Sequence, residues 1–367
     1  MNPEPTIPDP NVDPDPVAQA RARFGLRDVV LAAVVVIATL VLLVGATRLI
    51  DRGGNAPGKP SSGAIGAAAS ASSGTATTQS PRSSRNVGPS GSPGAAPTPL
   101  PSGDPKLVGA GDIGDCGATG DEGTAKLLDE VQGTVITLGD NAYENGTTRQ
   151  YHDCYAPNWG RQLARTRPAP GNHDWGKGTL DGYLGYYGAA ATGPGGVSWY
   201  SYELGTWHII VLDSSCNEVG CDTTSRQVAW LVKDLAASDA HCTLAYWHHP
   251  RFSSGFHGNS KSVATFWQRL YDAGVDVVIN GHDHDYERFA PQDPNGREDR
   301  QRGIREFVVG TGGTGLRKFE QTKPNSELRV ANVHGVIAFT LHDRSYDWQF
   351  IATAGSDFSD RGTANCH

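Results

Sequence analysis

Short apolar runs alternate with stretches of helical periodicity from about residue 106 to residue 280. The runs expected to form strands are 107–110, 135–138, 208–212, 243–247 and 275–279. The stretches expected to form helices are 122–131, 225–237 and 262–273. Further along, three runs are typical of strands with no helix between them, at 304–309, 336–341 and 346–352. The pattern predicts a layered α/β domain with a second, more antiparallel sheet.

The first part of the chain follows a different pattern. Positions 29–46 are apolar except for Thr39 and Gly45. Extended to residue 50, this run would cross roughly 30 Å as a helix, which matches the core of a bilayer. We therefore predict one transmembrane helix at 28–50. A cleaved signal peptide is the alternative, since Val44-Gly45-Ala46 offers small residues for cleavage, but 28 residues precede the run.

The segments on either side of this helix have few large apolar residues. Residues 1–27 are rich in Pro and Asp, and we expect them to form a disordered cytoplasmic tail. Residues 51–105 consist mainly of Gly, Ser, Ala and Pro, so we expect a flexible linker that averages roughly 40 Å from end to end. The globular domain is then 106–367. Basic residues flank both ends of the helix, so their distribution does not decide its orientation.

Cysteine usage and charge indicate where the domain works. All six cysteines follow the predicted helix, and no CxxC pair occurs among them. This pattern favours disulfides in an oxidising compartment, with buried free thiols as the alternative. We favour a short loop closed by Cys216 and Cys221, and a C-terminal bond from Cys242 to Cys366. The prediction is a single-pass membrane protein with an extracellular domain, or a secreted protein if the segment is cleaved. A formal charge of -8 argues against a nucleic-acid partner.

Five short motifs, each placed directly after a strand-like run, carry the candidate chemistry. They supply seven side chains of metal-ligand type, namely Asp112, Asp140, Tyr143, Asn172, His248, His282 and His284. Functional groups gather at the carboxyl ends of strands in such sheets, and a preceding glycine at four of these positions is expected to let the backbone turn tightly. Oxygen donors come first and imidazoles last. This set would suit two cations held against a phosphate.

The series resembles the calcineurin-like metallophosphoesterase superfamily, and within it the purple acid phosphatases. Most members of the superfamily begin with Asp-x-His, whereas the third position here is Gly114. Tyr143 instead stands three residues after Asp140, in the Gly-Asp-x-x-Tyr arrangement of the purple phosphatases. The resemblance covers essentially the whole globular domain. It implies a four-layer α/β/β/α sandwich, in which two packed mixed sheets are flanked by helices.

The resemblance also implies how the site works. One metal ion would be bound by Asp112, Asp140, Tyr143 and His284, and the other by Asp140, Asn172, His248 and His282. The pair would be Fe(III) with a divalent Fe, Zn or Mn, and a metal-activated hydroxide would attack a small phosphate monoester. His173 would contact the phosphate and protonate the leaving group, Asp174 would orient His173, and His257 would act in substrate binding or acid catalysis. For His249 both a structural role and an indirect functional role stay open.

Other interpretations compete with this one. Residues 310–315 match the GxGxxG pattern of dinucleotide sites, but Pro324 follows too closely for the long helix that such sites need. We therefore expect a tight loop near the rim of the active site. A phosphodiesterase or nucleotide-hydrolysing enzyme is the alternative within enzymes. A non-catalytic surface binding module is the alternative of another class, although such modules usually lose ligands. The oligomeric state stays open.

Overall fold

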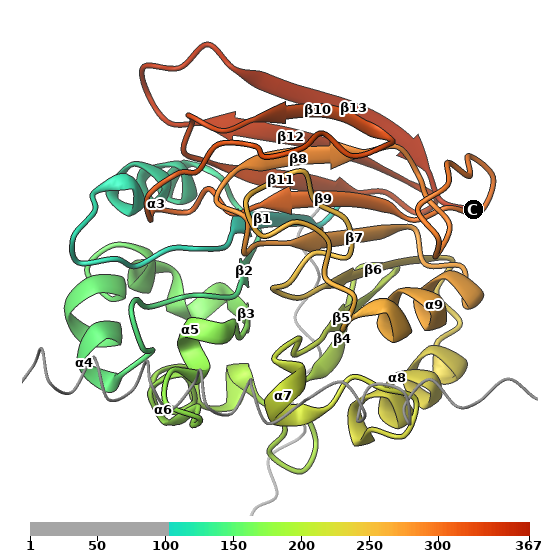
Figure 1. Cartoon of the computed structure of the whole chain (residues 1–367), viewed down its shortest axis with the longest axis horizontal. Coiled ribbons are helices and arrows are strands. Elements are labelled where there is room, and N and C mark those ends of the chain that lie inside the picture. The colour runs from blue at the N-terminus through green and yellow to red at the C-terminus, as the bar shows by residue number, and fades with distance from the viewer. Residues whose placement is uncertain (1–102) are drawn as a thin grey trace, which may run out of the picture. The chain divides into compact units, whose positions relative to one another are not determined.

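Two mixed β-sheets form the centre of the structure, a computed structural model that describes residues 103–367 (Figure 1). The strand order of the first sheet is β13-β12-β11-β1-β2-β3. Its strands are β1 (Lys106–Ala110), β2 (Thr134–Leu138), β3 (Thr166–Ala169), β11 (Gly335–Leu341), β12 (Ser345–Ala352) and β13 (Ser359–Asn365). Strands β1 to β3 run parallel, and β11 to β13 are antiparallel additions beside β1.

The second sheet has the strand order β10-β8-β9-β7-β6-β5-β4. Its strands are β4 (Tyr200–Leu204), β5 (Trp207–Val211), β6 (Cys242–Tyr246), β7 (Val277–Asn280), β8 (Tyr286–Phe289), β9 (Arg305–Val309) and β10 (Ser326–Val330). Strands β5, β6, β7 and β9 are parallel neighbours, while β4, β8 and β10 pair antiparallel at the edges. Each sheet therefore contains both kinds of pairing.

The helices cover the sheets according to the side-chain alternation of the strands. Along β6, Leu244 and Tyr246 belong to the core that both sheets share. Ala245 between them faces a second apolar cluster, to which the amphipathic helices α8 (Arg226–Ala237) and α9 (Ala264–Asp272) contribute. Helix α3 (Gly120–Glu130) packs beside β11 of the first sheet. Shorter helices are α4 (Thr148–Gln150), α5 (Asn172–Trp175), α6 (Asp181–Tyr187) and α7 (Cys216–Val219).

The predicted fold of two packed mixed sheets with helices is confirmed for these residues, with one correction. The C-terminal strands do not form a separate antiparallel sheet, because β9 joins the parallel strands of the second sheet while β11 and β12 extend the first. The predicted tail, the predicted transmembrane helix and almost all of the linker lie outside the described residues. Within 103–367, no helix combines the length and the apolar composition needed to cross a membrane.

All six cysteines pair in disulfides. The bonds are Cys116–Cys154, Cys216–Cys221 and Cys242–Cys366. Both favoured pairings are therefore confirmed, and the alternative of buried free thiols is wrong. The last bond closes a separation of 124 residues and ties the end of the chain to β6.

Candidate metal centre

The candidate ligands lie where the carboxyl ends of parallel strands from both sheets meet. Asp112 and Asp140 follow β1 and β2, and Asn172 begins α5 shortly after β3. His248 and His282 follow β6 and β7 of the second sheet. The first sheet therefore supplies the oxygen donors, and the second sheet supplies the imidazoles. This division explains why oxygen ligands precede histidines along the sequence.

Three of the candidate ligands have a positive φ angle, so the chain turns at the ligand itself. The φ angles of Asp112, Asp140 and His282 are 62°, 50° and 73°, in the left-handed region that side chains other than glycine seldom adopt. We expected the preceding glycines to let the backbone turn tightly, and this needs correction at Gly171 and Gly281. A Cβ atom would lie 2.2 Å from Asp140 Oδ1 at Gly171 and 2.7 Å from Asp112 Oδ2 at Gly281, so these glycines allow the carboxylates to approach closely.

One group of donor atoms surrounds the phenol oxygen of Tyr143. This oxygen lies 2.8 Å from Asp112 Oδ1 and 3.2 Å from Asp140 Oδ2. The same oxygen is 3.4 Å from His284 Nε2. All four side chains are almost completely buried. The structure therefore brings together the four residues predicted to hold the first cation, and we call them the Tyr143 group.

A second group surrounds Nε2 of His248. This nitrogen lies 3.1 Å from Asp140 Oδ2, 3.1 Å from Asn172 Oδ1 and 3.1 Å from His282 Nδ1. His248 is fully buried, whereas Asn172 is exposed and His282 is half-buried. These are the four residues predicted to hold the second cation, and we call them the His248 group. Asp140 Oδ2 belongs to both groups, as a bridging carboxylate requires.

Backbone carbonyl groups fix the orientation of two imidazoles. Nδ1 of His248 lies 2.8 Å from the carbonyl oxygen of Leu138, and Nδ1 of His284 lies 2.7 Å from that of Gly315. Since a carbonyl oxygen only accepts, each Nδ1 carries the hydrogen. In its neutral form, each ring then presents the lone pair of Nε2 to its group of donor atoms. Such rings are prepared to act as ligands.

The buried carboxylates of the cluster shift the pKa values of the groups around them. Burial alone would raise the pKa of Asp140, but the charge and hydrogen bond of His248 hold it below its ordinary value. Burial would lower the pKa of His248, yet Asp140 raises it to about 9. Burial, with Asp112 and Asp140 alongside, raises the pKa of Tyr143 well above its ordinary value. Ligand atoms of Asp112, Asp140 and His248 all lie within 4.8 Å of one another, so the residues fit bound cations.

His173 lies at the open side of the cluster. Its Nδ1 donates to the backbone carbonyl of Glu144 at 2.7 Å, and its Nε2 is 3.9 Å from Asp140 Oδ2. The ring centre lies 4.4 Å from that of Tyr143. About 28% of the side chain is exposed, so a bound ester could reach Nε2 from solvent.

The role predicted for Asp174 needs correction. Its carboxylate accepts hydrogen bonds from Tyr151 Oη at 2.6 Å, from the Gly171 amide at 2.8 Å and from Asn141 Nδ2 at 2.9 Å. None of its hydrogen bonds within the described residues goes to His173, which the Glu144 carbonyl orients instead. Burial and the nearby charge of Asp140 raise the pKa of Asp174 to about 6. Asp174 therefore holds the backbone around the ligands.

Sequence reasoning missed Arg317, which lies beside His257. Arg317 donates to His257 Nε2 at 2.6 Å, and the His257 ring centre lies 4.2 Å from that of His282. Burial and the positive charge of Arg317 lower the pKa of His257, against the opposing effect of Asp283. His257 is exposed and faces the cluster from the side of His282, the position expected for a substrate-facing residue.

The loop at 310–315 lies against the cluster, as predicted. The Thr314 amide donates to the Asp112 carbonyl at 3.0 Å, and the Gly315 carbonyl accepts from His284. The Arg317 amide then donates to the His284 carbonyl at 3.0 Å, which places this arginine at the rim. The available signal for Arg317 was its position directly after this loop.

His249 packs beside the His248 group. Its ring centre lies 4.3 Å from that of His282, and its Nδ1 lies 2.8 Å from the hydroxyl of Ser214. Burial and the neighbouring His248 lower the pKa of His249 to about 3, so the ring stays neutral. These contacts support a structural role, and the ring also lines a pocket beside the His248 group.

Comparisons with known proteins agree with this arrangement. Residues 105–286 match the family model of calcineurin-like phosphoesterases. Purple acid phosphatase 15 of Arabidopsis thaliana is 28% identical over 214 residues, covering 48% of this chain and 40% of that protein. The relative named Probable inactive purple acid phosphatase 27, from the same plant, is 27% identical over 253 residues, covering 58% of this chain and 39% of that protein.

The fold also matches a solved structure. The purple acid phosphatase PPD1 of yellow lupin (Lupinus luteus) superposes with a TM-score of 0.61 at 22% identity, over 74% of this chain and 55% of that one. The chain spans only 40% of Purple acid phosphatase 15. Residues 105–286 therefore form a calcineurin-like phosphoesterase domain, with purple acid phosphatases among its relatives.

Proposed function

We propose that this chain is a phosphoric ester hydrolase that cleaves phosphate monoesters at a binuclear metal site. The observation that carries the proposal is the pair of donor groups around Tyr143 Oη and His248 Nε2, which share Asp140 Oδ2. A shared carboxylate is the device that holds two cations close together. The similarity to purple acid phosphatases supports the same reaction class.

The two groups would hold different ions. Anionic oxygen donors such as Asp112 and a Tyr143 phenolate suit Fe(III), whereas imidazole and amide ligands suit a divalent Fe, Zn or Mn. When bound, such a pair activates water near neutral pH and offsets the charge on the phosphate oxygens. The ionisation of Tyr143 would depend on the cation, because its surroundings otherwise keep the phenol protonated.

The remaining residues would bind the ester and move one proton. With Nδ1 of His173 held by the Glu144 carbonyl, Nε2 is the atom that can donate to the leaving oxygen. His257 and Arg317 would contact the phosphate or its substituent from the opposite side. Asp140 would stay ionised between the two groups, while its Oδ1 is fixed by the His173 amide at 2.8 Å.

We further propose that this site works outside the membrane. The three disulfides support an oxidising compartment, since such bonds are rare in reducing cytosol. The apolar run at 29–46 supports an anchor, and signal cleavage would give a secreted enzyme instead. Protease accessibility of the disulfide-bonded domain on intact cells tests the orientation, and protection of the domain until lysis would refute it.

Two esters test the reaction class. The purified full-length chain, loaded with iron and zinc, should hydrolyse p-nitrophenyl phosphate faster than bis-p-nitrophenyl phosphate. A faster diester would favour the phosphodiesterase alternative. Metal binding with no turnover of either ester would favour a non-catalytic binding module; one relative carries the name probable inactive.

A further inference from the structure

A pocket of about 260 Å³ lies beside the His248 group. Its lining includes Asn172, Trp175, Ser215, Asn217, Glu218 and His249. Asn172 connects the pocket to the cluster, because its Oδ1 also lies 3.1 Å from His248 Nε2. The pocket has room for about eight or nine water molecules at liquid density, enough for a hexose-sized group. A group attached to a phosphate at the cluster could extend into this space.

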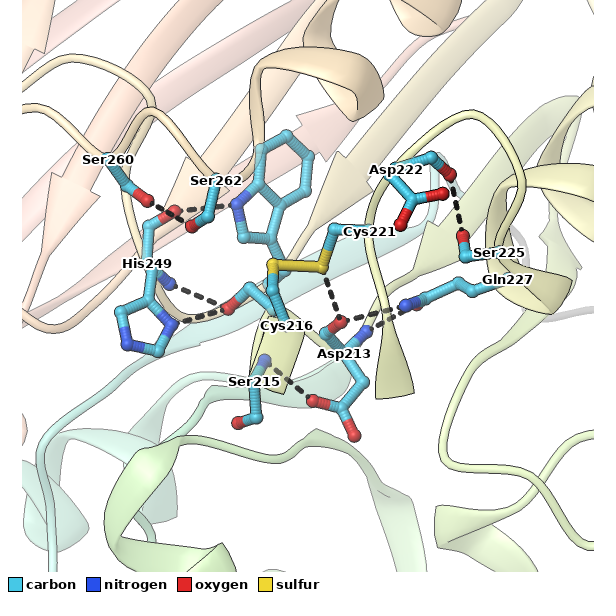
Figure 2. The surroundings of a disulfide bond; sticks show 12 residues. Asp213, Ser215, Cys216, Cys221, Asp222, Ser225, Gln227, His249, Ser260 and Ser262 are labelled. Carbon is cyan, nitrogen blue, oxygen red and sulfur yellow. Dashed lines mark hydrogen bonds between the residues drawn. A yellow bond between two sulfur atoms is a disulfide. The ribbon is translucent and has the colours of Figure 1, made fainter. Parts of the chain in front are cut away.

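A buried carboxylate, Asp213, holds two walls of the pocket together. Its Oδ2 accepts a hydrogen bond from the Trp175 indole at 3.1 Å, and its Oδ1 accepts one from the Ser215 amide at 2.9 Å. Figure 2 shows this second contact beside the Cys216–Cys221 disulfide, which closes the loop that follows Ser215. The pocket is therefore shaped by contacts already present in the chain.

The buried hydroxyl of Ser215 indicates that the pocket binds a ligand. Ser215 is only 8% exposed, and its Oγ makes no hydrogen bond of regular geometry among the described residues, although it lies near enough to Asp213 to oppose the rise in the pKa of that carboxylate. A buried hydroxyl without a partner is unfavourable, so such groups are normally satisfied. A hydroxyl of a bound alcohol would satisfy it. The Trp175 ring on another wall offers an apolar face against which the C–H groups of a sugar-like ring can pack.

The charges around the cluster differ between its two sides. Glu218 lines the pocket, and no lysine or arginine is among the described residues that line it. Arg317 lies beside His257 and is not among the residues that line the pocket. A second anionic group would therefore be disfavoured in the pocket and favoured near Arg317.

We propose that this pocket binds the alcohol part of the ester, and that the preferred alcohol is a neutral or cationic polyhydroxylated ring of hexose size. The inference rests on the proposed phosphatase function and specifies its substrate class. Trp175, Ser215 and Glu218 are then specificity-determining residues, because they contact the alcohol and not the phosphorus.

A series of esters that differ in the charge of the alcohol tests the proposal on the full-length chain. The esters are glucosamine 6-phosphate, glucose 6-phosphate and 6-phosphogluconate, with methyl phosphate as the reference that lacks a group for the pocket. We expect kcat/KM for glucose 6-phosphate to exceed that for methyl phosphate about tenfold, and 6-phosphogluconate, whose alcohol is an open-chain anion, to be the poorest of the three six-carbon esters. Glu218→Lys should reverse the order of the two charged esters, whereas Glu122→Lys on exposed α3 should leave it unchanged.

Ser215→Ala provides an independent test that keeps the loop intact. It should lower the ratio of glucose 6-phosphate to methyl phosphate about threefold to tenfold, through one lost hydrogen bond. Ratios unaffected by both substitutions would overturn the subsite while leaving the phosphatase proposal intact. A preference for 6-phosphogluconate that disappears in Arg317→Ala would place the alcohol on the other side and also overturn it. Absence of turnover with all four esters would instead refute the proposed function, and the subsite with it.

Discussion

The Tyr143 group and the His248 group share one carboxylate but differ in every other ligand. Around Tyr143 Oη the neighbours are two carboxylates and one imidazole, all buried. Around His248 Nε2 they are the shared carboxylate, an amide oxygen and a second imidazole, and the amide side chain is exposed. Under the proposed function, the first group would suit a highly charged, tightly held cation and the second a more exchangeable divalent one.

Removing the shared ligand should have the largest effect. Asp140→Asn keeps the shape of the side chain but removes the charge that both groups use. We expect it to lose both cations and to lower kcat/KM by about 10³-fold or more. Metal analysis and p-nitrophenyl phosphate hydrolysis on the same sample measure this. Asp153→Asn, at a surface ion pair, is the matched control. Retention of two metal equivalents by Asp140→Asn would refute the bridge.

Single histidine substitutions should separate the two groups. His284→Ala is expected to weaken binding of the ion in the Tyr143 group. His248→Ala is expected to weaken binding of the divalent ion. Each variant should retain about one equivalent of metal. Activity should fall about 10²-fold to 10³-fold in both variants. Added Zn²⁺ should restore part of the activity only in His248→Ala, because a weakened divalent site can be refilled at higher concentration. Equal rescue of both variants would contradict the distinction between the groups.

Arg317→Ala should have a smaller effect, on binding more than on turnover. The variant loses a positive charge at the rim and frees His257, so we expect KM to rise about tenfold with a smaller change in kcat. Lys318→Ala removes an exposed neighbouring charge and serves as control. A fall in kcat at constant KM would show that Arg317 acts on the chemical step instead.

His208 lies outside the cluster and contrasts with the candidate ligands. Its carboxylate partners favour a protonated ring and not a ring bound to a metal ion. Burial would lower its pKa, but Asp234 and Glu203 raise it above the ordinary value. Its stabilising contribution is therefore complete below about pH 6.5 and is lost as the pH rises through the folded-state pKa.

We expect His208→Gln to lower the free energy of unfolding by about 1 kcal/mol at pH 5.5, and by less at pH 9. Urea unfolding with and without metal measures both values. The difference should not depend on metal, and a metal-dependent difference would link His208 to the cluster.

Most of the fold could be predicted because the apolar runs of the central strands are uninterrupted. Edge strands were missed: β10, β4 and β13 alternate with exposed residues or carry glycine, and β3 holds a proline. The seven candidate ligands could be listed from the sequence because each follows a strand in a recognisable motif. Arg317 and the Ser215 pocket depend on contacts between distant segments, which local patterns do not contain. Asp174 was misjudged for the same reason, since its partners include Tyr151, whose ring orientation no sequence pattern fixes.

The visible spectrum of the purified chain, measured together with its iron content, tests the asymmetry of the two groups most directly. A phenolate bound to Fe(III) should give a tyrosinate-to-iron absorption band with one iron in the Tyr143 group. Tyr143→Phe should abolish the band, whereas Tyr187→Phe, which removes a buried hydroxyl bonded to Asn141 at 3.0 Å, should retain it. A colourless, active protein with two zinc or two manganese ions, or a band that persists in Tyr143→Phe, would contradict the account.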